Sequence, residues 1–230
     1  MSFINNGLKA FFDLLHEGIR VVGITNPNVS YGLSIILFTL IVRAILLPLN
    51  LKQMRSQAKM QEMQPEIKKI QDKYKNDPQK SQAEMMKLYK EKGANPMGGC
   101  LPLIIQLPIL WALFYVFRNI NTGGKVVSFL WIKDLFQPES TYIFGMRVSI
   151  LALLSGITQY ISTRFMPASG DPAQAKQAST MNVGMSIFMV FMAWNFTSAL
   201  VLYWVVNNLV QLAQNLLVKK IHFKEKQAAA

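Results

Sequence analysis

The sequence contains very little cysteine and histidine. Among its 230 residues there are one cysteine, Cys100, and two histidines, one near each end. An internal disulfide and a Cys/His metal cluster are therefore both excluded. The chain also has no HExxH, GxSxG or GxxxxGK string, so hydrolase and nucleotide-binding chemistry lack their usual residues. We expect no catalytic residue, no metal and no cofactor, and the protein is predicted not to be an enzyme.

Acidic residues are scarce as well, at 12 against 24 Lys and Arg, which gives a net charge of +12. A basic chain can bind nucleic acid, but most of this charge lies in two segments, residues 52–97 and 219–230, between or after apolar runs. Such segments are typical of attraction to anionic lipid, ribosomal RNA or an acidic protein. We expect no specific binding of DNA.

Long apolar runs dominate the rest of the chain, of which 51% is hydrophobic and only 16% charged. The first run, residues 29–51, would as a helix reach about 30 Å, the thickness of the hydrocarbon core of a bilayer. Residues 98–218 hold four more predicted spans, at residues 99–118, 142–165, 181–194 and 197–218. Residues 181–218 could also form one long helix or a re-entrant pair, although residues 195–197 favour a tight turn. The predicted fold class is an all-α integral membrane protein with five transmembrane helices.

The segments outside these spans are amphipathic or basic. Residues 1–28 are predicted to form an interfacial helix lying on the membrane, or else an ordinary amphipathic helix packed on protein. Residues 52–97 hold 11 basic residues and two apolar helical seams around a turn at residues 76–78, which predicts an antiparallel helical hairpin; a solvated linker is the alternative. Residues 119–141 hold two basic residues. The positive-inside rule then places the hairpin and the basic tail, residues 219–230, in the cytoplasm and the N-terminus outside.

Arg43 lies inside the first predicted span, and none of the 12 acidic residues falls within any span. Its guanidinium could snorkel to the nearer surface. Otherwise it needs water, backbone carbonyls or neutral polar side chains. Three polar stripes offer them: Thr39, Arg43 and Asn50; Ser155, Thr158, Gln159 and Ser162; Trp204, Asn207, Asn208 and Gln211. Such residues can simply join helices, at about 0.6 kcal/mol each. Beside an unpaired arginine, we expect them to enclose a hydrated, cationic cavity.

Four strings occur in order along the chain: IVRAILLPL at residues 41–49, MQPEIKKIQDKYKND at residues 63–77, NPMGGCLPLIIQLP at residues 95–108 and LYWVVNN at residues 202–208. In this order and spacing the chain, from about residue 31 to residue 218, resembles the YidC/Oxa membrane-protein insertases. The resemblance implies a bacterial plasma-membrane insertase of the short type, which lacks a large extracytoplasmic domain. It also implies a hydrophilic groove open to cytoplasm and lipid.

The same resemblance implies site residues and partners. Arg43 matches the groove arginine of the family and Trp204 its groove tryptophan, while either Gln159 or Ser162 takes the place of a groove glutamine. The expected groove residues are Thr39, Arg43, Gln106, Ser155, Gln159, Ser162, Trp204 and Asn207. Nascent membrane proteins are the expected clients, inserted into the lipid bilayer without nucleotide hydrolysis, with the ribosome and the Sec translocon or signal-recognition machinery as further partners. A small-anion transporter using Arg43 is the alternative, although the paired repeats common in transporters are not visible.

Overall fold

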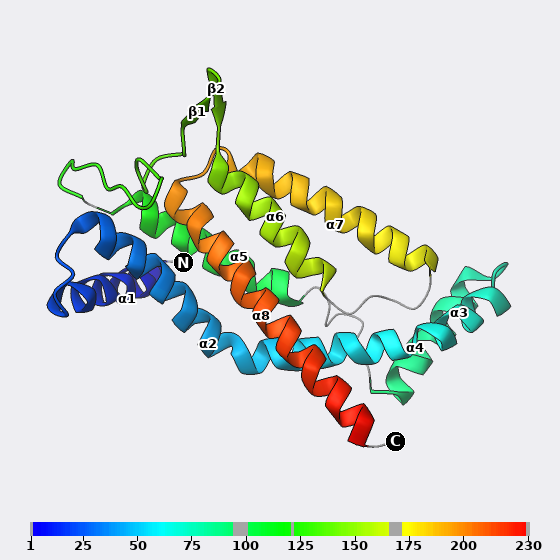
Figure 1. Ribbon diagram of the computed structural model, residues 1–230. Helices are drawn as coiled ribbons and strands as arrows, with labels where there is room; N and C mark the ends of the chain where they lie inside the picture. The colour runs from blue at the N-terminus through cyan, green and yellow to red at the C-terminus, as the bar shows by residue number, and fades with distance from the viewer. Residues whose placement is uncertain (1, 94–100, 121, 166–171, 229–230) are drawn as a thin grey trace.

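A computed structural model describes residues 2–93, 101–120, 122–165 and 172–228, and its described elements are mostly helices (Figure 1). The main helices are α2 (Pro27–Glu62), α5 (Leu101–Arg118), α6 (Ile150–Arg164), α7 (Pro172–Ala193) and α8 (Ser198–Ala228). Helix α1 (Ser2–Val21) lies at one end of them, whereas α3 (Gln64–Lys73) and α4 (Pro78–Glu91) extend beyond the other end. Strands β1 (Thr141–Ile143) and β2 (Met146–Val148) form an antiparallel hairpin just before α6.

The hydrophobic core lies at the end of the bundle that α1 closes. Phe12 of α1 is fully buried, with ring centroids 6.1 Å from Phe38 of α2 and 5.6 Å from Phe117 of α5. The apolar face of α1 is thus packed on protein, and the exposed Leu14 and Val21 leave a second apolar edge uncovered. Whether that edge lies on a membrane remains a prediction.

The segment between α5 and α6 forms part of this core instead of a loose polar loop. The side chains of Val127, Ile132 and Leu135 in this segment are buried in the core. Its Phe129 packs so closely on α2 that a Cβ added to Gly32 would lie 2.1 Å from the phenyl ring. Glycine at this position therefore allows the loop to pack closely on the first long helix, because any side chain would displace the ring of Phe129.

Two helices continue beyond the ends predicted for them. Helix α2 does not stop at residue 51 but runs on to Glu62, so the first span and the start of the predicted hairpin are one helix. Helix α8 likewise runs through the predicted basic tail to Ala228. Lysine, glutamine, methionine and alanine are good helix formers, and a change from apolar to charged residues alters what a helix faces without ending it.

The predicted third and fourth spans begin at the wrong residues. Residues 142–148 are not helical, because the chain reverses at Phe144 and Gly145, and α6 starts only after Ser149, whose side chain caps the Ala152 N–H. Helix α7 begins at Pro172, within the predicted loop 166–180, because proline suits a first helical turn and Ala, Gln and Lys follow it. Residues 166–171 of that loop lie outside the described residues.

The predicted tight turn at residues 195–197 is confirmed. The N–H of Asn195 donates to the carbonyl of Met192 and that of Phe196 to Ala193, and α8 begins at Ser198. Helices α6 and α7 pack closely, since a Cβ on Gly156 would lie 2.3 Å from a methyl group of Val190. In the described part of the chain two segments, Pro27–Ser56 and Ser198–Val218, are long and apolar enough to cross a membrane. The five-span count therefore stays a prediction.

Candidate functional site

Arg43 is buried where α2 packs on α8, and only 8% of its surface is exposed. Its Nε donates a hydrogen bond to Oδ1 of Asn207 at 2.5 Å, and its Nη2 donates to the backbone carbonyl of Asn207 at 3.2 Å. No ion pair with Arg43 occurs among the described residues. The guanidinium charge is therefore held by one neutral amide and one carbonyl, and two of its five N–H donors are accounted for.

Polar side chains continue along both helices from this pair. Asn50 follows Arg43 by seven residues on α2, and Gln214 follows Asn207 by seven on α8, so each lies two turns along the same helical face. Asn50 Nδ2, Gln53 Nε2 and Gln214 Oε1 are all buried, and no hydrogen-bond partner for them occurs among the described residues. We call Arg43, Asn50, Gln53, Asn207 and Gln214 the polar seam. Buried polar atoms of this kind are binding positions for water or for a polar ligand.

A second polar contact lies one helical turn from Asn207. Tyr203 is fully buried on α8, and its hydroxyl accepts a hydrogen bond of 2.8 Å from Nε2 of Gln106 on α5. Gln106 was predicted from the sequence as a groove residue, whereas Tyr203 was not, because it stands within an apolar stretch. Its spacing of four residues from Asn207 is the signal that identifies it.

The expected polar residues of α6 face α8, but they meet different residues of it. Asn208 Nδ2 donates to the Ser155 carbonyl and to Thr158 Oγ1, both at 3.3 Å, and Asn215 Nδ2 donates to the Ser162 carbonyl at 2.9 Å. Asn215 follows Asn208 by seven residues and Ser162 follows Ser155 by seven. The hydrogen bond from asparagine to the serine carbonyl therefore repeats after two helical turns. Ser155 and Ser162 are thus buried in the interface between α6 and α8, whereas Arg43 contacts Asn207.

The remaining groove candidates differ in how accessible they are. Trp204 is 5% exposed and packs edge-on against Phe196, at 5.7 Å between ring centroids, as part of the hydrophobic core. Thr39 is buried, and its hydroxyl donates to the Ile35 carbonyl of its own helix. Gln159 is half-buried on α6. Of the eight expected residues, the structure joins Arg43 to Asn207 directly and links Gln106 to the same face of α8 through Tyr203.

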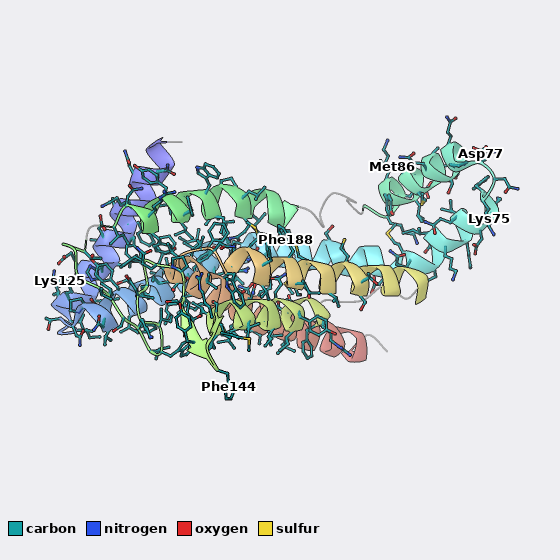
Figure 2. All side chains as sticks on the ribbon, turned by 90° about the horizontal axis from the view of Figure 1, so that it is seen from above. Lys75, Asp77, Met86, Lys125, Phe144 and Phe188 are labelled. Carbon is teal, nitrogen blue, oxygen red and sulfur yellow. The ribbon has the colours of Figure 1, made fainter. Side chains whose placement is uncertain are left out.

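Helices α3 and α4 form a separate small unit. Met63, Ile67 and Leu88 are buried between them, and an ion pair of 3.0 Å joins Lys92 to Glu66. Burial also raises the pKa of Tyr89 above its ordinary value. Figure 2 shows Lys75 and Asp77 at the turn of this hairpin, far from the main bundle. Its charged outer surface is available to a partner.

Residues 23–226 match the family described as 60Kd inner membrane protein. The chain is 54% identical to a protein named membrane protein insertase YidC from Clostridium tetani, and the match covers 97% of each chain. It is 50% identical to a protein of the same name from Clostridium acetobutylicum, over 95% of this chain and 84% of the relative. Among solved structures it is similar to an active YidC insertase with the first transmembrane domain resolved, with a TM-score of 0.66 and 35% identity. That match covers 91% of this chain and 45% of the other.

Proposed function

Because the chain belongs to the 60Kd inner membrane protein family, whose relatives are named membrane protein insertases, we propose that it inserts newly made membrane proteins by way of the polar seam. The observation that carries this proposal is the buried charge of Arg43, held only by Asn207 among the described residues. A charge inside a bilayer is costly, so its retention there is best explained by a ligand that it binds.

The physical difficulty in insertion is the polar flank of the client segment. Each unsatisfied backbone group in about 30 Å of hydrocarbon costs several kcal/mol. In our proposal, Arg43 accepts an acidic or carbonyl-rich flank with the N–H donors that Asn207 leaves free. The buried amides of Asn50, Gln53 and Gln214 offer further hydrogen bonds along the seam. The flank then has polar partners for part of its path.

The apolar part of the client supplies the driving force. We propose that it leaves the seam along α6 and α8 into lipid, where burial contributes about 25 cal/mol for each Å² removed from water. No nucleotide hydrolysis is then required. Among the groove candidates, half-buried Gln159 is better placed than buried Ser162 to meet a client. Ser155, Ser162 and Trp204 are assigned to the wall that keeps α8 in position.

The orientation that we propose places the α3–α4 hairpin and the C-terminus in the cytoplasm and the N-terminus outside, with five spans. The 11 basic residues of residues 52–97, against two in residues 119–141, support it. The hairpin would then meet clients and, in the same compartment, the ribosome and the Sec or signal-recognition machinery. In a Cys100→Ser background, Asn76→Cys should react with an impermeant maleimide only from the cytoplasm and Lys125→Cys only from outside.

Asn207 offers a sharp test of the seam, because its side chain touches the guanidinium. Asn207→Asp would place a carboxylate against Arg43 and neutralise it, so insertion of a single-span client with an acidic flank should fall strongly. Asn207→Leu is the matched control, since it removes the amide but leaves the charge available. Arg43→Lys should retain substantial insertion, because it keeps the charge and loses only the planar fork.

The same client with a neutral flank provides the second axis of the experiment, at matched expression. The loss in Asn207→Asp should be much smaller with this client, because only the electrostatic attraction has gone. Equal loss with both clients, or none with either, would contradict the role proposed for Arg43. Uptake of a labelled anion by the purified protein in liposomes would instead support an anion transporter.

A further inference from the structure

Two tight turns between α5 and α6 have bulky apolar residues at their tips. Phe144 has φ 50° and Leu130 has φ 53°, and no other non-glycine residue in the described ranges has a positive φ. Both side chains point into open space, with 97% of Phe144 and 71% of Leu130 exposed. A left-handed backbone is unfavourable for such residues, so each tip combines local strain with an exposed apolar group.

The turn at Phe144 shows how unusual this choice of residue is. Ile143 pairs with Met146 across a two-residue turn, and both central residues, Phe144 and Gly145, have positive φ, as in a type I′ turn. Asparagine followed by glycine is the preferred pair for such a turn. An asparagine would fit this backbone better and would prefer water. The phenylalanine is therefore not explained by the folding of the hairpin.

The hairpin extends beyond the start of α6 and to one side of the bundle (Figures 1 and 2). In both views it leaves the start of α6 and extends away from the neighbouring helices, and Figure 2 shows Phe144 pointing clear of all of them. Helix α6 follows the hairpin directly and exposes Leu153, Ile157 and Ile161, four residues apart, along one face. In a membrane helix this face is covered by lipid, so the hairpin extends over the lipid that borders α6.

The length of α6 sets the depth of the hairpin. Its 15 residues reach about 22 Å, less than the roughly 30 Å of a hydrocarbon core. A helix that is too short thins the bilayer locally or draws its flanking residues into the interface. If α6 spans the membrane, the tip of a hairpin at its start is therefore expected at the level of the headgroups and the first acyl carbons.

Glu139 fixes both turns to the start of α6. Its carboxylate accepts hydrogen bonds from the Leu151 N–H at 2.6 Å, Ser149 Oγ at 3.0 Å, Trp131 Nε1 at 3.1 Å and Thr141 Oγ1 at 3.2 Å. Trp131 is the neighbour of Leu130 in the first turn, and Thr141 begins β1. The two tips are thus held in place before they meet any ligand, which lowers the entropic cost of binding.

We propose that these two turns form an anchor that inserts its apolar tips into the outer leaflet of the membrane, with phospholipid as the ligand. Phe144, Tyr142 and Met146 supply the exposed apolar surface of the hairpin. Tryptophan and tyrosine are favoured at this depth. Arg147 is exposed and its Nη2 donates to the Glu139 carbonyl at 3.4 Å, which leaves its other N–H groups for lipid phosphate. The proposal rests on the orientation proposed above and requires that α6 spans the membrane, but it does not depend on the insertase activity.

The test measures the surroundings of the tip in the full chain. In a Cys100→Ser background, Phe144→Cys is labelled with the fluorophore NBD and reconstituted in phosphatidylcholine–phosphatidylglycerol liposomes. Lys125→Cys is the matched control, because Lys125 is also an exposed loop residue but lies at the end of the bundle (Figure 2). NBD at residue 144 should show blue-shifted emission and strong quenching by a lipid with a nitroxide near its headgroup. NBD at residue 125 should show neither.

Three results would overturn the anchor. Equal emission and quenching at residues 144 and 125 would mean that lipid does not distinguish the tip. Shielding of residue 144 in native membranes but not in the liposomes would mean that a protein covers it. A Phe144→Asn variant keeps a favourable turn, so NBD at Leu130→Cys should be less quenched in that variant than with Phe144 present; unchanged quenching would mean that the hairpin does not hold the first turn in lipid.

Discussion

Helix α8 uses the same side chain in opposite ways on two neighbouring faces. Asn208 and Asn215 donate to backbone carbonyls of α6, in a contact that repeats every seven residues. Asn207, one position before Asn208, instead accepts a hydrogen bond from the guanidinium of Arg43. The contact with α6 links neutral groups through interhelical hydrogen bonds. The contact with α2 holds a full positive charge with one neutral residue.

This difference shows that residue type alone does not distinguish a helix contact from a binding site. The amide of Asn208 joins two helices because it faces free carbonyls of α6. The amide of Asn207, one residue earlier, faces a guanidinium whose charge it cannot neutralise. The two faces differ in whether each buried polar group has a partner that satisfies its hydrogen bonds and its charge. The following changes test whether the α2 face supports function and the α6 face supports stability.

Arg43→Ala should have the largest effect. A hydrogen bond to a charged group contributes about 1.5–3 kcal/mol, so losing it in the client complex should slow insertion of an acid-flanked client by about tenfold or more. Stability should be unchanged or higher, because an unpaired charge leaves the bilayer. Insertion assays and unfolding of the same preparation check both expectations. Equal insertion by variant and parent would reduce Arg43 to a residue that snorkels.

The double change Asn208→Leu and Asn215→Leu should have the reverse profile. Three interhelical hydrogen bonds at about 0.6 kcal/mol each should be lost from the free energy of unfolding, roughly 2 kcal/mol in all. Insertion per folded molecule should stay near that of the parent. Denaturant titration in micelles measures the first quantity and a liposome insertion assay the second. Strong loss of insertion without loss of stability would show that the α6 face also binds clients.

Tyr203→Phe changes a residue on the Asn207 face of α8 and should have a smaller effect. It removes the hydroxyl that accepts from Gln106 but keeps the buried ring, so about 0.6 kcal/mol of stability is at stake. Insertion should fall slightly if Gln106 needs this contact to keep its orientation, and Gln106→Leu should then add nothing further. Additive losses in the double variant would mean that the two side chains act independently.

A change of pH should produce the smallest effect, and it should be confined to α1. His16 hydrogen-bonds Ser30 at 2.9 Å and stacks on Tyr31, and burial lowers its pKa, opposed in part by the charge of Glu17. The unfolded state then binds the proton more readily, so stability is complete above pH 6.5 and falls as the pH drops below it. Hydrogen exchange in α1 at about pH 7.5 and about pH 5.5 should reveal this, and His16→Gln should abolish it.

The sequence was sufficient to identify the family and the long apolar helices. It also singled out Arg43, whose part in function stays a prediction. It predicted the turn at residues 195–197, because the apolar pattern stops there. It did not predict where several helices begin and end. The end of α2 depends on helix propensity, whereas the start of α6 depends on Glu139, which lies far enough upstream that no local pattern reveals its contact with Leu151.

The partners of the polar residues could not be predicted either. A helical face is about 100° wide, and residues 207 and 208 differ by one step of that size. Asn207 and Asn208 therefore belong to one stripe in the sequence and to two interfaces in the fold. Only the packing of α2, α6 and α8 decides which helix each meets. The spacing of Tyr203 from Asn207 marks it as a neighbour on the same face of α8, but its contact with Gln106 depends on how α5 packs.

The unbroken course of α2 has a mechanical consequence. Arg43 lies near the middle of its 36 residues and the α3–α4 hairpin follows its end, so the stretch between them acts as a lever arm about 28 Å long. Pro48 lies between the two. It has no N–H to donate to the backbone carbonyl four residues earlier, so the helix is expected to bend at this point. Movement of the α3–α4 hairpin would therefore bend α2 at Pro48, five residues from Arg43. A partner that binds the hairpin and moves it would thus displace the guanidinium of Arg43 through one continuous helix.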